Sequence, residues 1–200
     1  VVFTNLLNQS GAKLTAQSNQ SVDWLRKMAS QVNKVNSEQL ILSKQDAFKR
    51  IVKLSETSIG KMYMFIYDPK TKEKLPYYDM FPLVIPLQSM ESGFLALNLH
   101  YLPPRYRAAF MDKLMNFAVL DVNDDPKRLR VTYDILNATK QYREFKPCLK
   151  KYLFSNVNSK IVAVQPNEWD IAAFLPVQQF KNAKPQEVWQ DSINEIKGRQ

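Results

Sequence analysis

The chain has 200 residues, 45% of them hydrophobic, which is enough to bury the core of one ordinary domain or two small ones. Its four glycines lack phosphate-loop spacing, and one Cys and one His are too few for a zinc finger, a two-histidine metal site or a disulfide framework. No stretch approaches the roughly 18 apolar residues of a membrane span. The sequence therefore predicts no metal, no cofactor, no small-molecule substrate, no membrane association and no catalytic residues.

The formal net charge of +9 is concentrated in the middle of the chain. Residues 101–160 carry 12 basic and six acidic side chains, whereas residues 161–200 carry four basic and five acidic ones. A basic middle fits an anionic partner, such as a nucleic-acid backbone or an acidic protein surface. Because acids are interleaved with the bases, these cations fit the solvated faces of helices equally well.

Residues 1–58 are predicted to form an N-terminal arm followed by helices. The first twenty residues are rich in Asn, Gln and Ser, which favours an extended or peripheral segment. From Ser21 the apolar residues recur at helical spacing, which predicts a helix with an apolar stripe of Val22, Leu25, Met28 or Ala29, Val32 and Val35. A second helix is predicted over residues 44–54.

Residues 59–200 are predicted to form an α+β core domain that begins with a small antiparallel β unit over residues 60–102. Residues 62–67 read as a strand, and three prolines between Pro76 and Pro86 leave room only for a short strand at residues 83–85. Residues 93–102 form the best strand, whose alternation separates the leucines from Phe94, Ala96 and Asn98. This unit has three or four strands, and a barrel-like arrangement is one alternative for them.

The rest of the domain, residues 103–200, is predicted to be mainly helical. A helix begins at Pro103-Pro104 with Tyr106 and Phe110 on its apolar stripe, and another begins at Asp125-Pro126. We also expect a short helix over residues 147–153, a strand over residues 160–164, and helices over residues 169–174 and 185–196. The expected fold is thus a β unit flanked by N-terminal and C-terminal helices.

Three patterns in the sequence are candidates for catalysis. Glu144-Phe145-Lys146, ten residues after Asp134, has the acid-x-Lys spacing of a metal-dependent nuclease, but Pro147 follows at once and such short motifs are common by chance. His100 is expected to be a structural hydrogen-bonding residue rather than a general base. Cys148 lies in a basic stretch but has no neighbouring acid–base group, so a buried structural thiol is favoured.

The best candidates for binding an anion are arginines at the starts of two predicted helices. Cations at a helix N-terminus oppose its dipole, so they do not serve helix stability, and with the free N–H groups they can receive phosphate or carboxylate. Pairing with nearby acids of the same chain explains them equally well. The predicted binding residues for nucleic acid or an acidic partner are Arg105, Arg107, Arg128, Arg130, Lys150 and Lys151.

A proline-pinned aromatic loop over residues 75–82 is the best candidate for a protein interface. Aromatic rings either fill the core or dominate a contact surface, and neighbouring rings in an extended segment point to opposite sides. We expect at least one of Tyr77 and Tyr78 to be buried against the β unit, and the rest of the loop, including Phe81, to face a partner.

Several of these segments resemble a virion-associated family of contractile-tailed bacteriophages, in which such sequences are described as DNA end protectors. The similarity covers roughly residues 60–192, and the first sixty residues match nothing comparable. It implies a minor head protein on the genome terminus and supplies no catalytic residues. The segments that carry it are residues 62–70, 75–83, 93–94, 97–103, 174–177 and 188–192, together with Trp169 and Phe180.

The resemblance implies a non-enzymatic virion protein, assembled in the host cytoplasm, whose partners are other virion proteins and, in the DNA-binding interpretation, double-stranded DNA at the head–neck region. A tail or baseplate subunit that makes only protein contacts is the main alternative. A basic nucleic-acid-binding module outside a particle and a metal-dependent nuclease are further alternatives.

Overall fold

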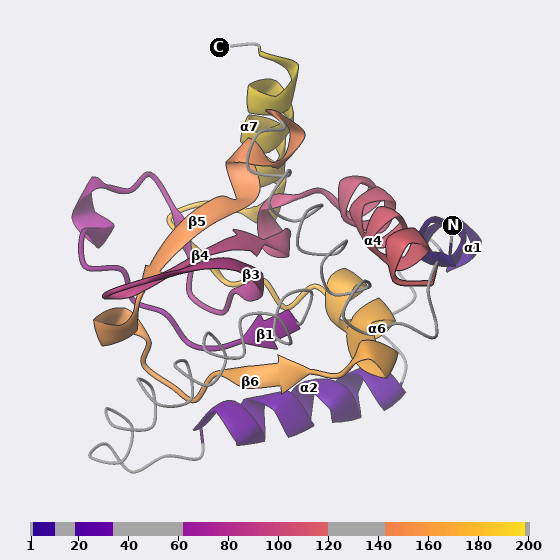
Figure 1. Cartoon of the computed structure of the whole chain (residues 1–200), viewed down its shortest axis with the longest axis horizontal. Coiled ribbons are helices and arrows are strands. Elements are labelled where there is room, and N and C mark those ends of the chain that lie inside the picture. The colour runs from indigo at the N-terminus through magenta and orange to yellow at the C-terminus, as the bar shows by residue number, and fades with distance from the viewer. Residues whose placement is uncertain (1, 11–18, 34–61, 120–142, 199–200) are drawn as a thin grey trace.

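The computed structural model describes residues 2–10, 19–33, 62–119 and 143–198, and these form a mixed α+β fold around an open antiparallel sheet (Figure 1). The sheet has five strands in the order β5-β4-β3-β1-β6, and a second sheet pairs β2 with β7. The expected α+β class is confirmed. The strands are β1 (Met62–Met64), β2 (Tyr78–Asp79), β3 (Leu83–Met90), β4 (Gly93–Asn98), β5 (Leu149–Leu153), β6 (Val162–Val164) and β7 (Phe180–Lys181).

The sheet does not close into a barrel, so the barrel-like alternative is wrong. A barrel requires its first and last strands to pair, but within the described residues β5 pairs only with β4 and β6 only with β1. The helix α2 (Asn19–Asn33) lies beside β6 instead (Figure 1). Two of the five strands also come from residues after 102, where mainly helices were expected, although the strand at β6 was predicted.

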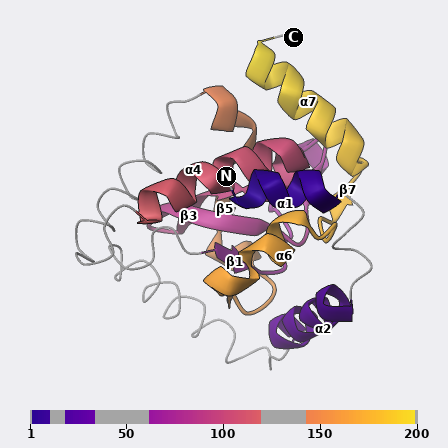
Figure 2. The same cartoon turned by 90° about the vertical axis from the view of Figure 1, so that its right-hand side faces the viewer.

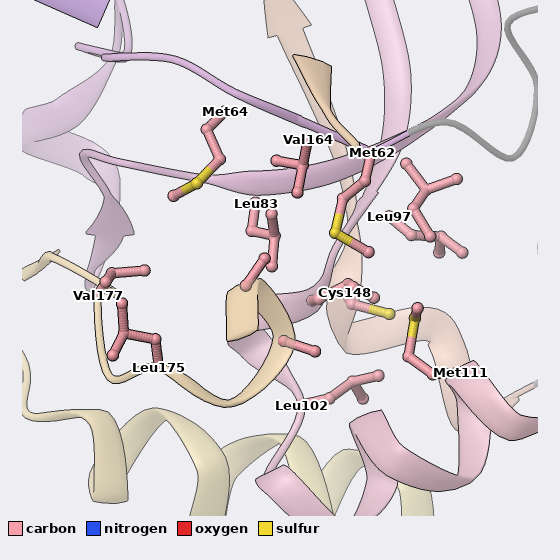
Figure 3. Close-up of a cluster of buried hydrophobic side chains, with 14 of the residues drawn as sticks. Met62, Met64, Leu83, Leu97, Leu102, Met111, Cys148, Val164, Leu175 and Val177 are labelled. Carbon is pink, nitrogen blue, oxygen red and sulfur yellow. The ribbon is translucent and has the colours of Figure 1, made fainter. Parts of the chain in front are cut away.

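Both faces of the sheet are apolar, as the alternation along β4 predicts. Leu97 belongs to a large core that the helices cover, with Met62, Leu83 and Met111 among its members (Figure 3). Phe94 and Ala96 point to the other face and belong to a smaller aromatic cluster. A sheet with two buried faces has little room for a solvated binding surface on either of them.

The helices lie mainly against the large core. Figure 2 shows α1 lying along α4, with α6 below them and α7 apart at the C-terminal end. The predicted helices at residues 169–174 and 185–196 and the start at Pro103-Pro104 are confirmed. The helices, besides α2, are α1 (Val2–Ser10), α4 (Pro104–Val119), α6 (Trp169–Phe174) and α7 (Pro185–Lys197), with short 3₁₀ turns η1 (Lys72–Lys74), η2 (Leu99–Tyr101), η3 (Arg143–Cys148), η4 (Phe154–Asn156) and η5 (Pro166–Glu168).

The N-terminal segment differs from the expectation. Residues 2–10 form α1 rather than an extended arm, because the Asp112 carboxylate accepts the N–H groups of Phe3 and Thr4 and Phe3 is buried. In α2 the helix is confirmed, and Met28 and Val32 of the predicted apolar stripe are buried, but Val22 and Leu25 are exposed. The buried face consists of Ser21, Trp24, Met28 and Val32. The large Trp24 indole determines which face of the helix packs against the core.

Residues 147–153 were predicted to be helical, and this is wrong: η3 ends at Cys148 and β5 begins at Leu149. Gly93 explains the pairing, because a Cβ there would lie 2.0 Å from the Tyr152 carbonyl oxygen, so only glycine lets β5 approach β4 this closely. In α4, Phe110 is buried but Tyr106 is exposed. The predicted helices at residues 44–54 and after Asp125-Pro126, and the domain division after residue 58, lie outside the described residues.

Candidate nucleic-acid interface

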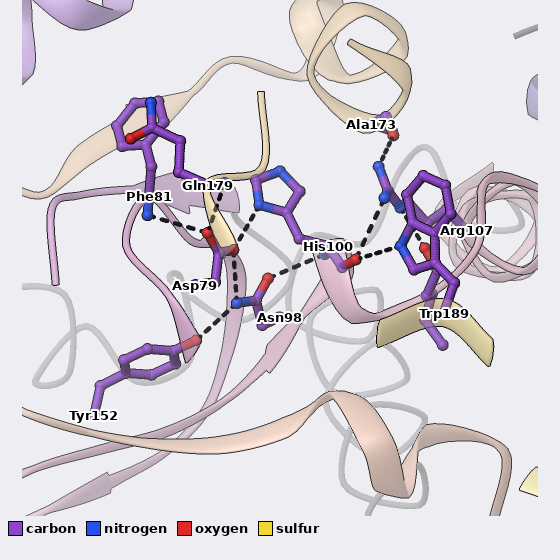
Figure 4. A network of polar contacts seen from close by, with 10 residues as sticks. Asp79, Phe81, Asn98, His100, Arg107, Tyr152, Ala173, Gln179 and Trp189 are labelled. Carbon is purple, nitrogen blue, oxygen red and sulfur yellow. Dashed lines mark hydrogen bonds and ion pairs between the residues drawn. The ribbon is translucent and has the colours of Figure 1, made fainter. Parts of the chain in front are cut away.

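His100, the candidate general base, belongs to a buried polar network, and Asp79 is the centre of this network (Figure 4). One carboxylate oxygen accepts the N–H groups of Phe81 (3.1 Å) and Gln179 (3.2 Å), while the other contacts the Asn98 amide (3.1 Å) and His100 Nδ1 (2.7 Å). The Asn98 amide also donates to the Tyr152 hydroxyl at 3.0 Å. These contacts join β2, β4, η2, β5 and the segment before β7.

The pKa shifts in this network follow from burial and from mutual contact. Burial lowers the pKa of His100, Asp79 opposes this shift, and the net pKa stays below the usual value. Burial raises the pKa of Asp79, but His100, Asn98 and the Phe81 N–H outweigh it and hold the pKa low. The pair is therefore a neutral imidazole that donates from Nδ1 to a carboxylate.

Arg107 and Trp189 hold the chain that follows His100. The Arg107 guanidinium donates to the carbonyls of Leu102 (2.7 Å) and Ala173 (2.8 Å), and it lies 5.5 Å from the centre of the Trp189 ring. The Trp189 indole donates to the His100 carbonyl at 2.8 Å. Burial lowers the pKa of Arg107 to about 10. These groups fasten η2, α4, α6 and α7 together.

The nuclease-like motif does not have nuclease geometry. Glu144 to Lys146 lie in η3, where a central strand would be needed, and Lys146 Nζ lies 3.7 Å from Glu195. Asp134 lies outside the described residues. Cys148 is a buried thiol whose pKa burial raises to about 12, as expected of a structural residue. Among the described residues, no group of three or more His, Cys, Asp or Glu is placed to hold a metal ion.

The predicted cationic residues have different surroundings. Arg105 is exposed in the first turn of α4. In contrast, Arg107 is 1% exposed, and its N–H groups donate to backbone carbonyls. Lys151 is exposed on the edge strand β5. The neighbouring Lys150 is half-buried with Nζ 4.0 Å from the centre of the Tyr101 ring, and burial lowers its pKa. Arg128 and Arg130 lie outside the described residues.

The aromatic loop is divided between the core and the surface. Phe81 is buried in the large core. Tyr77 is half-buried against Tyr101 and Phe180. Burial, and to a smaller extent the negative charge of Asp191, raise the pKa of Tyr77 to about 12. Tyr78 is half-buried in β2, opposite Lys181. A protein interface at Tyr78 stays a prediction.

The charged turn over residues 70–74, directly before this loop, was not among the predicted sites. In the structure Lys70, Lys74, Leu75 and Pro76 are all exposed, so cations and apolar groups lie side by side there. The signal in the sequence was the alternation of lysines at positions 70, 72 and 74 directly before Leu75.

These features define a basic α+β protein in which the buried Asp79 and Arg107 are bonded into the fold, whereas Arg105, Lys151 and Lys113 are exposed. The chain belongs to the family of the phage T4 terminal DNA protecting protein, whose family model matches residues 7–192. This confirms the phage resemblance and extends it into the first sixty residues. Comparisons with curated proteins and with solved structures gave no match. None of the described helices combines the length and apolar character that crossing a bilayer requires.

Proposed function

We propose that this chain is a non-enzymatic virion protein that binds the ends of packaged double-stranded DNA and shields them. The family match over residues 7–192 carries the proposal. The particle is that of a contractile-tailed phage, with the protein at the head–neck region among other virion proteins. The buried state of His100, Asp79 and Cys148 supports a role without catalysis, because a catalytic group has to reach its substrate.

The phosphate contacts come from the exposed cations. Arg105 and Lys151 are the proposed contacts within the described residues, with Arg128 and Arg130 as further ones. Arg107 is left out because its guanidinium is buried and bonded to carbonyls. Lys150 contributes little to phosphate binding, because its ammonium group packs on the Tyr101 ring.

The salt dependence of binding tests these contacts. Each cation that neutralises a phosphate releases counterions, so log affinity falls with log salt by about 0.9 per contact. For the double variant Arg105→Gln, Lys151→Gln, we expect the slope measured on a short blunt duplex to fall by about 1.8.

Lys113→Gln is the matched control, because Lys113 is an exposed cation on the same helix as Arg105, two turns further on. Its slope should equal that of the wild type. Undetectable binding at low salt would instead favour a tail or baseplate subunit that contacts only protein. Cleavage of the duplex with Mg²⁺ or Mn²⁺ that Glu144→Ala abolishes would contradict the non-enzymatic role.

A further inference from the structure

The loop over residues 70–76 projects from the body and exposes an apolar tip. In Figure 1 it forms the left-hand edge of the molecule, beyond β5. Leu75 is 37% exposed, and the neighbouring Pro76 is exposed as well. Two adjacent exposed apolar side chains on a projecting loop are placed to pack against a partner.

The loop is held in one shape. Lys74 N donates to the Thr71 carbonyl at 3.0 Å and Leu75 N to the Lys72 carbonyl at 3.2 Å, which closes the turn η1. At its base, Asp68 N donates to the Asn156 carbonyl at 3.0 Å, and the Asn156 amide donates back to the Asp68 carbonyl at 2.8 Å. Because the tip is already ordered, it loses little conformational entropy when it docks.

The charges around the tip favour an anionic partner. Lys72 forms an ion pair with Asp68 at 2.9 Å, so its charge is used within the loop and not for a partner. Lys70 and Lys74 are exposed and make no ion pair within the described part of the chain. Glu73 is the one acid between residues 70 and 76. Two cations without an ion-pair partner in the described ranges thus lie just before the apolar tip.

We propose that this loop recognises the end of a DNA duplex, with Leu75 and Pro76 packed on the outer face of the terminal base pair and Lys70 and Lys74 on the phosphates beside it. The inference rests on the proposed function and names the element that performs it. An interior base pair is stacked on both faces, but a terminal one has a free apolar face. Leucine and proline side chains are suited to pack against such faces, and lysines hold the adjoining backbone.

The test compares a blunt linear duplex with a duplex of the same sequence whose two ends are closed by hairpin loops. End preference is the dissociation constant for the closed duplex divided by the dissociation constant for the linear duplex. For Leu75→Ser we expect this ratio to fall by about tenfold, the effect of losing one buried leucine side chain, while affinity for the closed duplex is unchanged. For Lys70→Gln, Lys74→Gln we expect the salt slope on the linear duplex to fall by about 1.8.

Val22→Ser is the matched control, because Val22 is 38% exposed on α2 and its loss should leave end preference intact. Wild-type protein without any end preference would contradict the proposed function itself. Wild-type preference that Leu75→Ser retains would overturn only the assignment to this loop. A Leu75→Ser protein that keeps its end preference but fails to enter particles would identify the loop as a protein-docking surface, which also overturns the assignment.

Discussion

Asp79 shows how a titratable group serves the fold. A carboxylate has about four lone-pair sites, and here four donors from Phe81, Gln179, Asn98 and His100 occupy them. Such a network is strong when every donor finds its acceptor, and costly to break because the donors are then left buried without partners. This accounts for His100 as a structural residue.

The same network makes the stability of the protein sensitive to acid. The pKa of His100 is lower in the folded chain than its usual 6.5, so the unfolded chain binds more protons as the pH falls below 6.5. The free energy of unfolding should therefore decrease below pH 6.5, by up to about 1.4 kcal/mol per pH unit. Asp79, whose pKa is also lowered, adds a further loss as the pH falls through 3.8. Urea unfolding at several pH values measures both.

His100→Gln provides the control, because His100 is the one histidine of the chain. Its stability should be nearly independent of pH between about 6.5 and 5, whatever its value at neutral pH. An equal slope in the variant and the wild type would show that another group is responsible.

At the scale of elements, α1 depends on one distant carboxylate. Asp112 on α4 accepts the N–H groups of Phe3 (2.8 Å) and Thr4 (2.9 Å), which have no partner within α1 because they begin it. Asp112→Ala should lower the free energy of unfolding by about 1–2 kcal/mol and release α1. Hydrogen exchange of residues 2–10 should increase in this variant.

The exposed neighbour Lys113 supplies the comparison for this prediction. Lys113→Ala should leave the exchange of residues 2–10 and the stability nearly unchanged. Unchanged exchange in Asp112→Ala would mean that the contact of Phe3 with Phe174, with ring centres 6.2 Å apart, holds α1 without the carboxylate.

The elements that the sequence predicted correctly are those whose own residues determine them. In α7, Pro185 begins the helix and Val188 and Ser192 face inward, which spacing alone indicates. The two faces of β4 follow from alternation in the same way. β5 was not predicted, since its close approach to β4 depends on Gly93, a residue of another strand that lacks a Cβ.

The candidate site was less predictable because contacts distant in sequence decide which cations are free. Arg105 and Arg107 look alike in the sequence, but the Ala173 carbonyl, 66 residues away, and the Trp189 ring bury only Arg107. The exposed loop at residues 70–76 was visible as a charged turn, but not as a rigid one. Its shape depends on Asn156.

At the scale of the whole molecule, the acids of the C-terminal helix have partners within the chain. Glu187 accepts the Lys184 N–H at the start of α7, and Glu195 pairs with Lys146. Arg105, Lys151, Lys70 and Lys74 are exposed. The net charge of +9 attracts an anionic partner to the protein over long range.

Protection of a linear duplex from an exonuclease that requires a free end tests the central claim most directly. The purified full-length chain is added to blunt linear DNA before the exonuclease, and a second sample receives an endonuclease that cuts internally. We expect the DNA to survive the exonuclease at protein concentrations that leave internal cutting unchanged, because only the ends are covered. Digestion from the ends at the rate of free DNA, or equal protection against both enzymes, would contradict the account.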